Sequence, residues 1–162
     1  VAAEICVLGY CNMLAYSDNP KATAQTIDSS GWLHTGDIGC MDSRGYLKVT
    51  GRLKDMIIRG GENLFPVEIE NRLLEHPQIM EVAVIGVSDK KWGEVVVAFL
   101  RVSFEAPKVD ELAVFCREKL SPQKTPKYWV FVDEWPLTGS GKIQKFTLRE
   151  KFEAGGFAVA SR

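Results

Sequence analysis

Residues 51–63 read Gly-Arg-Leu-Lys-Asp-Met-Ile-Ile-Arg-Gly-Gly-Glu-Asn and mark the place where the character of the chain changes. The segment sets charged residues around apolar ones and ends in a two-glycine turn. Glycines in such a turn permit a positive φ, or the close approach of a ligand to the backbone. From composition alone a solvated hairpin is the more frequent explanation, so the flanking sequence must distinguish a structural turn from a binding loop.

The residues after this segment predict strands and helices in alternation. Apolar runs dense in Val, Ala, Ile and Phe predict buried strands at 81–87, 94–102 and 128–132. Helical periodicity predicts helices at 66–75 and 109–120, and the capping-box pair Thr147 and Glu150 predicts the start of a last helix. This order predicts a small domain of the α+β class, with a central three-stranded sheet flanked by helices.

The residues before the segment carry less apolar material. Short β segments are predicted at 4–9, 36–42 and 46–50, and a short helix at 20–28. These elements are too few to bury a core of their own. We therefore expect residues 1–53 to be the β-rich edge of a larger domain and residues 54–162 to be the small domain.

The overall composition excludes several classes of protein. The 162 residues include 20 Lys and Arg against 21 Asp and Glu, which leaves no basic excess for binding nucleic acid. A hydrophobic fraction of 46% excludes a disordered scaffold. There is no apolar run long enough for a membrane span and no signal-like start, and the first residue is not Met. We expect a soluble, cytoplasmic piece of a longer protein.

The cysteines and histidines predict no metal site. The four cysteines are scattered and form no Cys-x-x-Cys pair, and His34 and His76 stand far from any ligand cluster in the sequence. Free thiols in a reducing compartment are the better interpretation.

Two further clusters contain residue types that phosphate-ester chemistry uses. Asp37 closes the segment 31–37, Gly-Trp-Leu-His-Thr-Gly-Asp, and a carboxylate after a tight turn can accept hydrogen bonds from a ribose diol or simply cap the turn. Lys142 follows Gly-Ser-Gly on a loop that begins at Pro136, where it can act as a mobile point charge or as a solvated lysine. The spacing does not fit a phosphate-binding P-loop, because Pro136 and Ile143 stand where that motif needs glycine and a hydroxyl residue.

Together the three clusters resemble the C-terminal portion of the adenylate-forming enzymes. This superfamily contains acyl- and aryl-CoA synthetases, peptide-synthetase adenylation domains and firefly-type luciferases. The similarity covers nearly the whole chain, and Gly-Gly-Glu-Asn at 60–63 with Phe-Thr-Leu-Arg-Glu at 146–150 looks most like a medium-chain acyl-CoA synthetase.

The resemblance implies a role for each cluster. Asp37 and Arg52 would hold the ribose of the adenylate, and Lys142 would bridge the carboxylate and the α-phosphate during adenylation. Lys54 would be the hinge of the small domain, and Gly60 and Gly61 would line the path of the CoA thiol. The segment from Pro136 to Lys142 also resembles the pattern that bacterial lysine acetyltransferases modify, and acetylation would remove the charge of Lys142.

The resemblance also implies substrates and partners. The substrates would be ATP, CoA and a carboxylic acid, which we expect to be a fatty acid. Mg²⁺ would enter with ATP and be held mainly by a large N-terminal domain that this chain lacks. This chain alone is then expected to be inactive. A mitochondrial matrix location stays open, as do two alternatives: an adenylation domain that passes its acyl group to a carrier protein, and a freestanding, non-catalytic lid-like interaction module.

Overall fold

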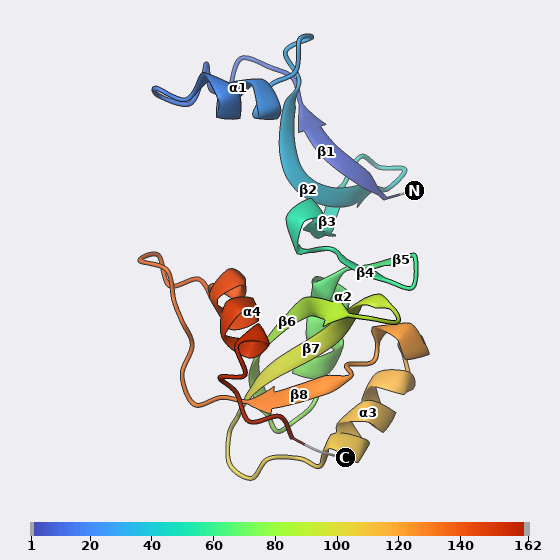
Figure 1. The fold of residues 1–162 in the computed structure, drawn as a ribbon. Helices are drawn as coiled ribbons and strands as arrows, with labels where there is room; N and C mark the ends of the chain where they lie inside the picture. Colours follow the sequence, from blue (N-terminus) through green and yellow to red (C-terminus); the bar gives the residue numbers. More distant parts are fainter. Residues whose placement is uncertain (1, 161–162) are drawn as a thin grey trace. The chain divides into compact units, whose positions relative to one another are not determined.

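The computed structural model describes residues 2–160 and divides the chain into two compact units, Val1–Lys54 and Asp55–Arg162 (Figure 1). The division falls one residue after the boundary expected from the sequence. Each unit is described by itself below.

The first unit is a three-stranded antiparallel sheet with one short helix. Its elements are β1 (Ala3–Val7), α1 (Pro20–Thr26), β2 (Leu33–Met41) and β3 (Leu47–Arg52), with the strands in the order β1-β2-β3. Pro20 opens α1, and the side chain of Asn19 caps it by accepting a hydrogen bond from the amide of Ala22 at 3.0 Å. The predicted elements are all present in this unit.

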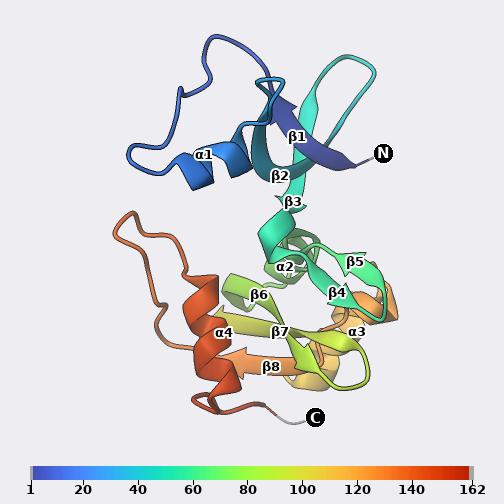
Figure 2. The same ribbon diagram turned by 45° about the horizontal axis from the view of Figure 1, so that its top comes forward.

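The second unit is a five-stranded sheet with three α-helices (Figure 2). Its strands are β4 (Ile57–Arg59), β5 (Glu62–Leu64), β6 (Ile79–Asp89), β7 (Gly93–Val102) and β8 (Tyr128–Phe131). Its helices are α2 (Pro66–Leu74), α3 (Val109–Arg117) and α4 (Lys145–Glu153); the short 3₁₀ turns are Leu53–Asp55, which crosses the boundary between the units, and Pro122–Lys124. The strand order is β5-β4-β7-β6, and β8 pairs in parallel with β7.

The α+β class is confirmed, but the sheet is larger than the predicted three strands. The three predicted strands are β6, β7 and β8. The two additional strands, β4 and β5, pair across the two-glycine turn, with Ile57 opposite Leu64 and Arg59 opposite Glu62.

Both faces of this sheet are buried, which explains the continuous apolar runs. Along β7 alternate residues enter opposite cores: Val96, Ala98 and Leu100 pack with α2 and α3, whereas Val95, Val97 and Phe99 pack toward Leu148 of α4. The helices therefore cover the sheet on both sides.

The start of α4 differs from the capping-box prediction. The helix begins at Lys145 after Gln144, and the hydroxyl of Thr147 donates to the side-chain oxygen of Gln144 at 3.0 Å. Thr147 thus lies inside the first turn and does not cap the helix. Among the described residues, no helix is long and apolar enough to cross a lipid bilayer.

Candidate functional site

Asp37 and Arg52 form a cross-strand pair in the first unit. Their Cα atoms are register partners in β2 and β3, and Arg52 Nε donates a hydrogen bond to Asp37 Oδ1 at 2.9 Å. The Asp37 side chain is 29% exposed and that of Arg52 is 53% exposed, so both are accessible to a ligand within this unit. A carboxylate that accepts and a guanidinium that donates are suited to a pair of adjacent hydroxyl groups.

The backbone before Asp37 is held in an irregular conformation. Gly36 has a φ of +73°, in the left-handed region that favours glycine. Thr35 Oγ1 donates to the carbonyl of Ile5 at 2.8 Å and accepts from the amide of Asp37 at 3.1 Å. These bonds set the direction in which the Asp37 carboxylate leaves the strand.

Gly60 and Gly61 form the turn between β4 and β5, and both have positive φ, +59° and +83°. Two central residues with positive φ are what a tight hairpin turn of type I′ requires. A Cβ at Gly60 would lie 3.0 Å from Cε3 of Trp92, whereas a Cβ at Gly61 would meet nothing within 4 Å. Gly60 is therefore required by packing, and Gly61 leaves an open surface on the exposed side of the turn.

Asp89 holds the neighbouring β6–β7 turn that carries Trp92. Its Oδ1 accepts from the amides of Lys91 and Trp92 at 2.9 and 3.0 Å, and Lys127 Nζ lies 2.7 Å from its Oδ2. The ammonium of Lys127 and these two amides lower the pKa of Asp89 to about 2. The Gly60 amide also donates to the Trp92 carbonyl at 2.8 Å, so the two turns are joined. Neither Asp89 nor Trp92 was predicted to be a site residue, although the Asp-Lys-Lys-Trp-Gly run between two strands is a turn signal.

Lys142 lies in a hydrogen-bonded loop of the second unit, and its side chain is exposed. The Thr138 amide donates to the Lys142 carbonyl at 2.8 Å, and the Lys142 amide donates to Thr138 Oγ1 at 3.0 Å. Leu137 and Ile143 form a β-bridge around these bonds. In the range 2–160, no ion pair involves Lys142. The backbone is thus held in place while the ammonium remains available to a ligand.

The predicted site residues are divided between the two units. Asp37 and Arg52 are brought together in the first, whose last residue is the exposed Lys54, whereas the two glycines and Lys142 belong to the second. The turn around Lys54 is the 3₁₀ segment Leu53–Asp55.

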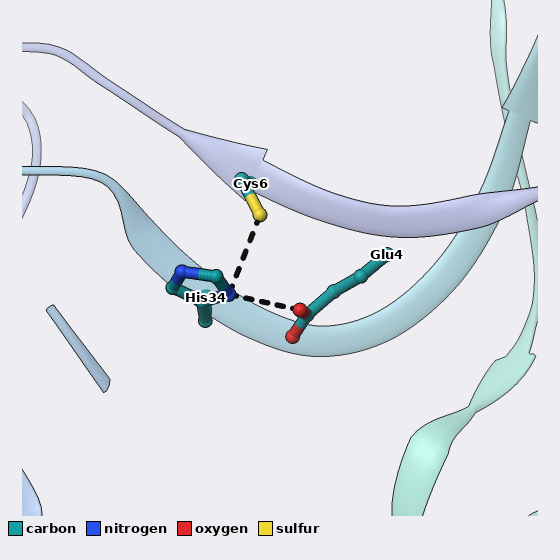
Figure 3. A group of neighbouring side chains, drawn as sticks. All are labelled: Glu4, Cys6 and His34. Carbon is teal, nitrogen blue, oxygen red and sulfur yellow. Dashed lines mark hydrogen bonds and ion pairs between the residues drawn. The ribbon is translucent and has the colours of Figure 1, made fainter. Parts of the chain in front are cut away.

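A further cluster, which the sequence analysis missed, lies between β1 and β2 (Figure 3). His34 was expected to stand far from any ligand cluster, but its Nδ1 lies 2.8 Å from Glu4 Oε2 and 3.6 Å from Cys6 Sγ. The hydrogen bond between His34 and Glu4 raises the pKa of His34 and lowers the pKa of Glu4. The signal in the sequence was the spacing of Glu4 and Cys6, two residues apart on one strand face.

The fold matches that of the C-terminal domain of the adenylate-forming enzymes. Residues 68–142 match the family described as AMP-binding enzyme C-terminal domain, and the chain contains this domain. It is 48% identical over 154 residues to the mitochondrial medium-chain acyl-CoA ligase ACSF2 of Mus musculus, an alignment that covers 94% of this chain and 25% of that protein. It is 47% identical over 149 residues to the putative acyl-CoA synthetase YngI of Bacillus subtilis, covering 91% of this chain and 27% of that protein.

Solved structures show the same relationship. ATP-bound MatB from Rhodopseudomonas palustris superposes with a TM-score of 0.87 at 34% identity, over 94% of this chain and 31% of that one. The o-succinylbenzoate CoA synthetase MenE of Bacillus subtilis, in complex with its acyl-adenylate intermediate, superposes with a TM-score of 0.84 at 37% identity, over 94% of this chain and 30% of that one. The chain thus spans about a quarter of the length of the curated relatives it matches.

Proposed function

We propose that this chain is the C-terminal part of an ATP-dependent acyl-CoA synthetase. In the first half-reaction a carboxylate oxygen attacks the α-phosphorus of ATP, which forms acyl-AMP and releases pyrophosphate. In the second, the CoA thiol attacks the acyl carbonyl, AMP leaves and the thiol proton is lost. The observation that carries the proposal is the Asp37–Arg52 pair at 2.9 Å in a chain 48% identical to an acyl-CoA ligase.

Asp37 and Arg52 bind the ribose hydroxyls of the adenylate in this proposal. Arg52 lies on one side of the carboxylate and already donates to Oδ1, which orients Asp37 before the nucleotide arrives. A preformed pair lowers the entropic cost of ordering both side chains on binding.

Lys142 is the residue that we assign to adenylation. Negative charge accumulates at the α-phosphate and the attacking carboxylate, and an ammonium placed there stabilises the transition state by several kcal/mol. The backbone of Lys142 is held by its hydrogen bonds to Thr138, and its side chain is exposed. Acetylation would remove this charge, so a lysine acetyltransferase acting here would switch off adenylation.

Lys54 and the two glycines serve the second half-reaction. The division of the chain after Lys54 supports a hinge at this residue, and the open side of Gly61 supports a passage for the thiol. As the family resemblance implies, Mg²⁺ would accompany ATP and be bound mainly by the N-terminal part of the enzyme. A fatty acid substrate is supported by the similarity to medium-chain acyl-CoA ligases. The cytoplasmic location stays a prediction, and the similar ACSF2 proteins are mitochondrial.

The test separates the two half-reactions in the complete enzyme. Lys142→Ala should lower acid-dependent ATP–pyrophosphate exchange by on the order of 100-fold or more, and leave CoA transfer from supplied acyl-AMP within about twofold. Lys151→Ala is the matched control, because Lys151 is also an exposed lysine of the second unit. Equal loss of both half-reactions would contradict the assignment. Acyl transfer to a holo carrier protein in place of CoA would support the carrier alternative.

A further inference from the structure

Glu4, Cys6 and His34 converge between the first two strands. Cys6 and His34 are register partners in β1 and β2, so their side chains stand opposite each other on one face of the sheet. Glu4 lies two residues before Cys6 and reaches the same imidazole nitrogen (Figure 3). One carboxylate oxygen, the thiol sulfur and one ring nitrogen lie within 4.8 Å of one another.

The distances fit the ligand shell of zinc. Bond lengths of about 2.3 Å to sulfur and about 2.05 Å to nitrogen, at a tetrahedral angle, place the two ligand atoms about 3.6 Å apart. Cys6 Sγ and His34 Nδ1 are 3.6 Å apart without any adjustment. The Glu4 oxygen, now at hydrogen-bond distance of 2.8 Å, would move away by about 0.5 Å when a metal replaces the shared proton.

Asp28 lies near the other ring nitrogen of His34, where a ligating histidine normally has an outer partner. When Nδ1 binds a metal, Nε2 carries the proton and donates it to a neighbouring carboxylate or carbonyl. Asp28 Oδ2 lies 3.6 Å from His34 Nε2. The other oxygen of Asp28 accepts from the amides of Ser30 and Trp32 at 2.8 and 3.0 Å, which holds the carboxylate at this place.

We propose that Glu4, Cys6 and His34 bind one Zn²⁺ ion, with Asp28 orienting the histidine and a fourth position open to water. The ligand set of one sulfur, one nitrogen and one carboxylate oxygen favours zinc over Mg²⁺ or Ca²⁺, which prefer oxygen ligands. The ion joins β1 to β2 through the residue pair Cys6 and His34. The sequence predicted no metal site, so this proposal departs from that prediction. The proposal does not depend on the proposed synthetase activity.

The experiment titrates the metal-free 162-residue chain with Co²⁺ as a spectroscopic substitute and with Zn²⁺ by calorimetry. We expect one ion per chain and a thiolate-to-cobalt charge-transfer band. Cys6→Ser should remove the band and weaken Zn²⁺ binding at least tenfold, and Asp28→Asn, which keeps an oxygen for the loop amides, should weaken it by about tenfold. Cys40→Ser is the matched control, because Cys40 is a half-buried thiol of the same sheet outside the cluster, and it should change neither measurement.

A band that survives in Cys6→Ser, or the absence of a band at one equivalent of Co²⁺, overturns the proposal. Circular dichroism establishes that each variant is folded. If Cys6→Ser does not fold, the test is the rate of alkylation of the unsubstituted protein. Zn²⁺ should slow alkylation of Cys6 at least tenfold and leave alkylation of the exposed Cys11 unchanged. Equal alkylation rates of Cys6 with and without Zn²⁺ overturn the proposal.

Discussion

Leu148 attaches α4 to the sheet together with the half-buried Phe152 of the same helix. Leu148 is 1% exposed and is the buried residue of that helix, where it packs in the core that contains Phe99 and Val130. Leu148→Ala removes three carbon groups, worth about 2.4 kcal/mol of transfer free energy at about 0.8 kcal/mol each. The cavity left behind adds to this, and because a helix on one face of a sheet can partly settle into it, we expect a total of about 3 kcal/mol.

The assay is urea unfolding of the whole chain, followed by tryptophan fluorescence, to which the buried Trp129 contributes. With a denaturant dependence of about 1.5 kcal/mol per molar, the loss corresponds to a fall of about 2 M in the unfolding midpoint of the second unit. Phe146→Ala is the control on the same helix, because Phe146 is 63% exposed and should change the free energy of unfolding by no more than about 0.5 kcal/mol. A loss below about 1 kcal/mol for Leu148→Ala, or an equal loss for Phe146→Ala, would refute the view that this contact anchors α4.

Three further substitutions test the turns and the boundary between the units. Gly60→Ala should lower the free energy of unfolding by about 1–2 kcal/mol, because φ is +59° and the new Cβ meets Trp92 at 3.0 Å; an unchanged urea midpoint contradicts this. Asp89 has a pKa of about 2, below the unfolded value of 3.8, so its ionised form stabilises the fold above about pH 4 and that stability is lost as the pH falls toward 2. Unfolding of Asp89→Asn should therefore depend less on pH between 4 and 2 than that of the unsubstituted chain, and equal dependence would show that the Lys127 pair contributes nothing. In the complete enzyme, Lys54→Pro should preserve pyrophosphate exchange and slow CoA transfer, since proline restricts φ; an equal effect on both would argue against a hinge.

The main strands and helices of the second unit could be predicted because local pattern and tertiary burial agree there. Residues 95–100 are apolar at successive positions, and β7 has cores on both faces, so a continuous run was the correct signal. The helix predicted at 66–75 begins with Pro66 and ends at Leu74.

A hairpin at the two-glycine turn was weighed from composition, but the addition of β4 and β5 to the sheet could not be predicted, because strands of three residues show no period. What holds β4 is distant in sequence: Arg59 pairs with Gly93 of β7, and the Ile58 amide donates to the carboxylate of Glu94 at 2.7 Å. The capping-box prediction at Thr147 failed for a related reason. The helix begins at Lys145, whose ammonium forms an ion pair with Glu70 at 2.7 Å, a contact that local spacing does not contain.

The Glu4, Cys6 and His34 cluster depends on an irregularity that no local pattern reports. From Glu4 to Cys6 the first strand advances by two residues, whereas its partner runs from Ile38 back to His34, four residues. β2 therefore has two more residues than β1 in this stretch. Because two is an even number, side chains keep their alternation between the faces, and His34 lies on the same face as Glu4 and Cys6. The excess is accommodated at Gly36, whose φ is +73° and whose amide donates to the second oxygen of Glu4 at 3.1 Å. The same bend precedes Asp37 directly, so a single bulge both assembles the cluster and sets the carboxylate that faces Arg52. A substitution at Gly36 that removed the bulge would therefore disturb both together, whereas Cys6→Ser disturbs the cluster alone.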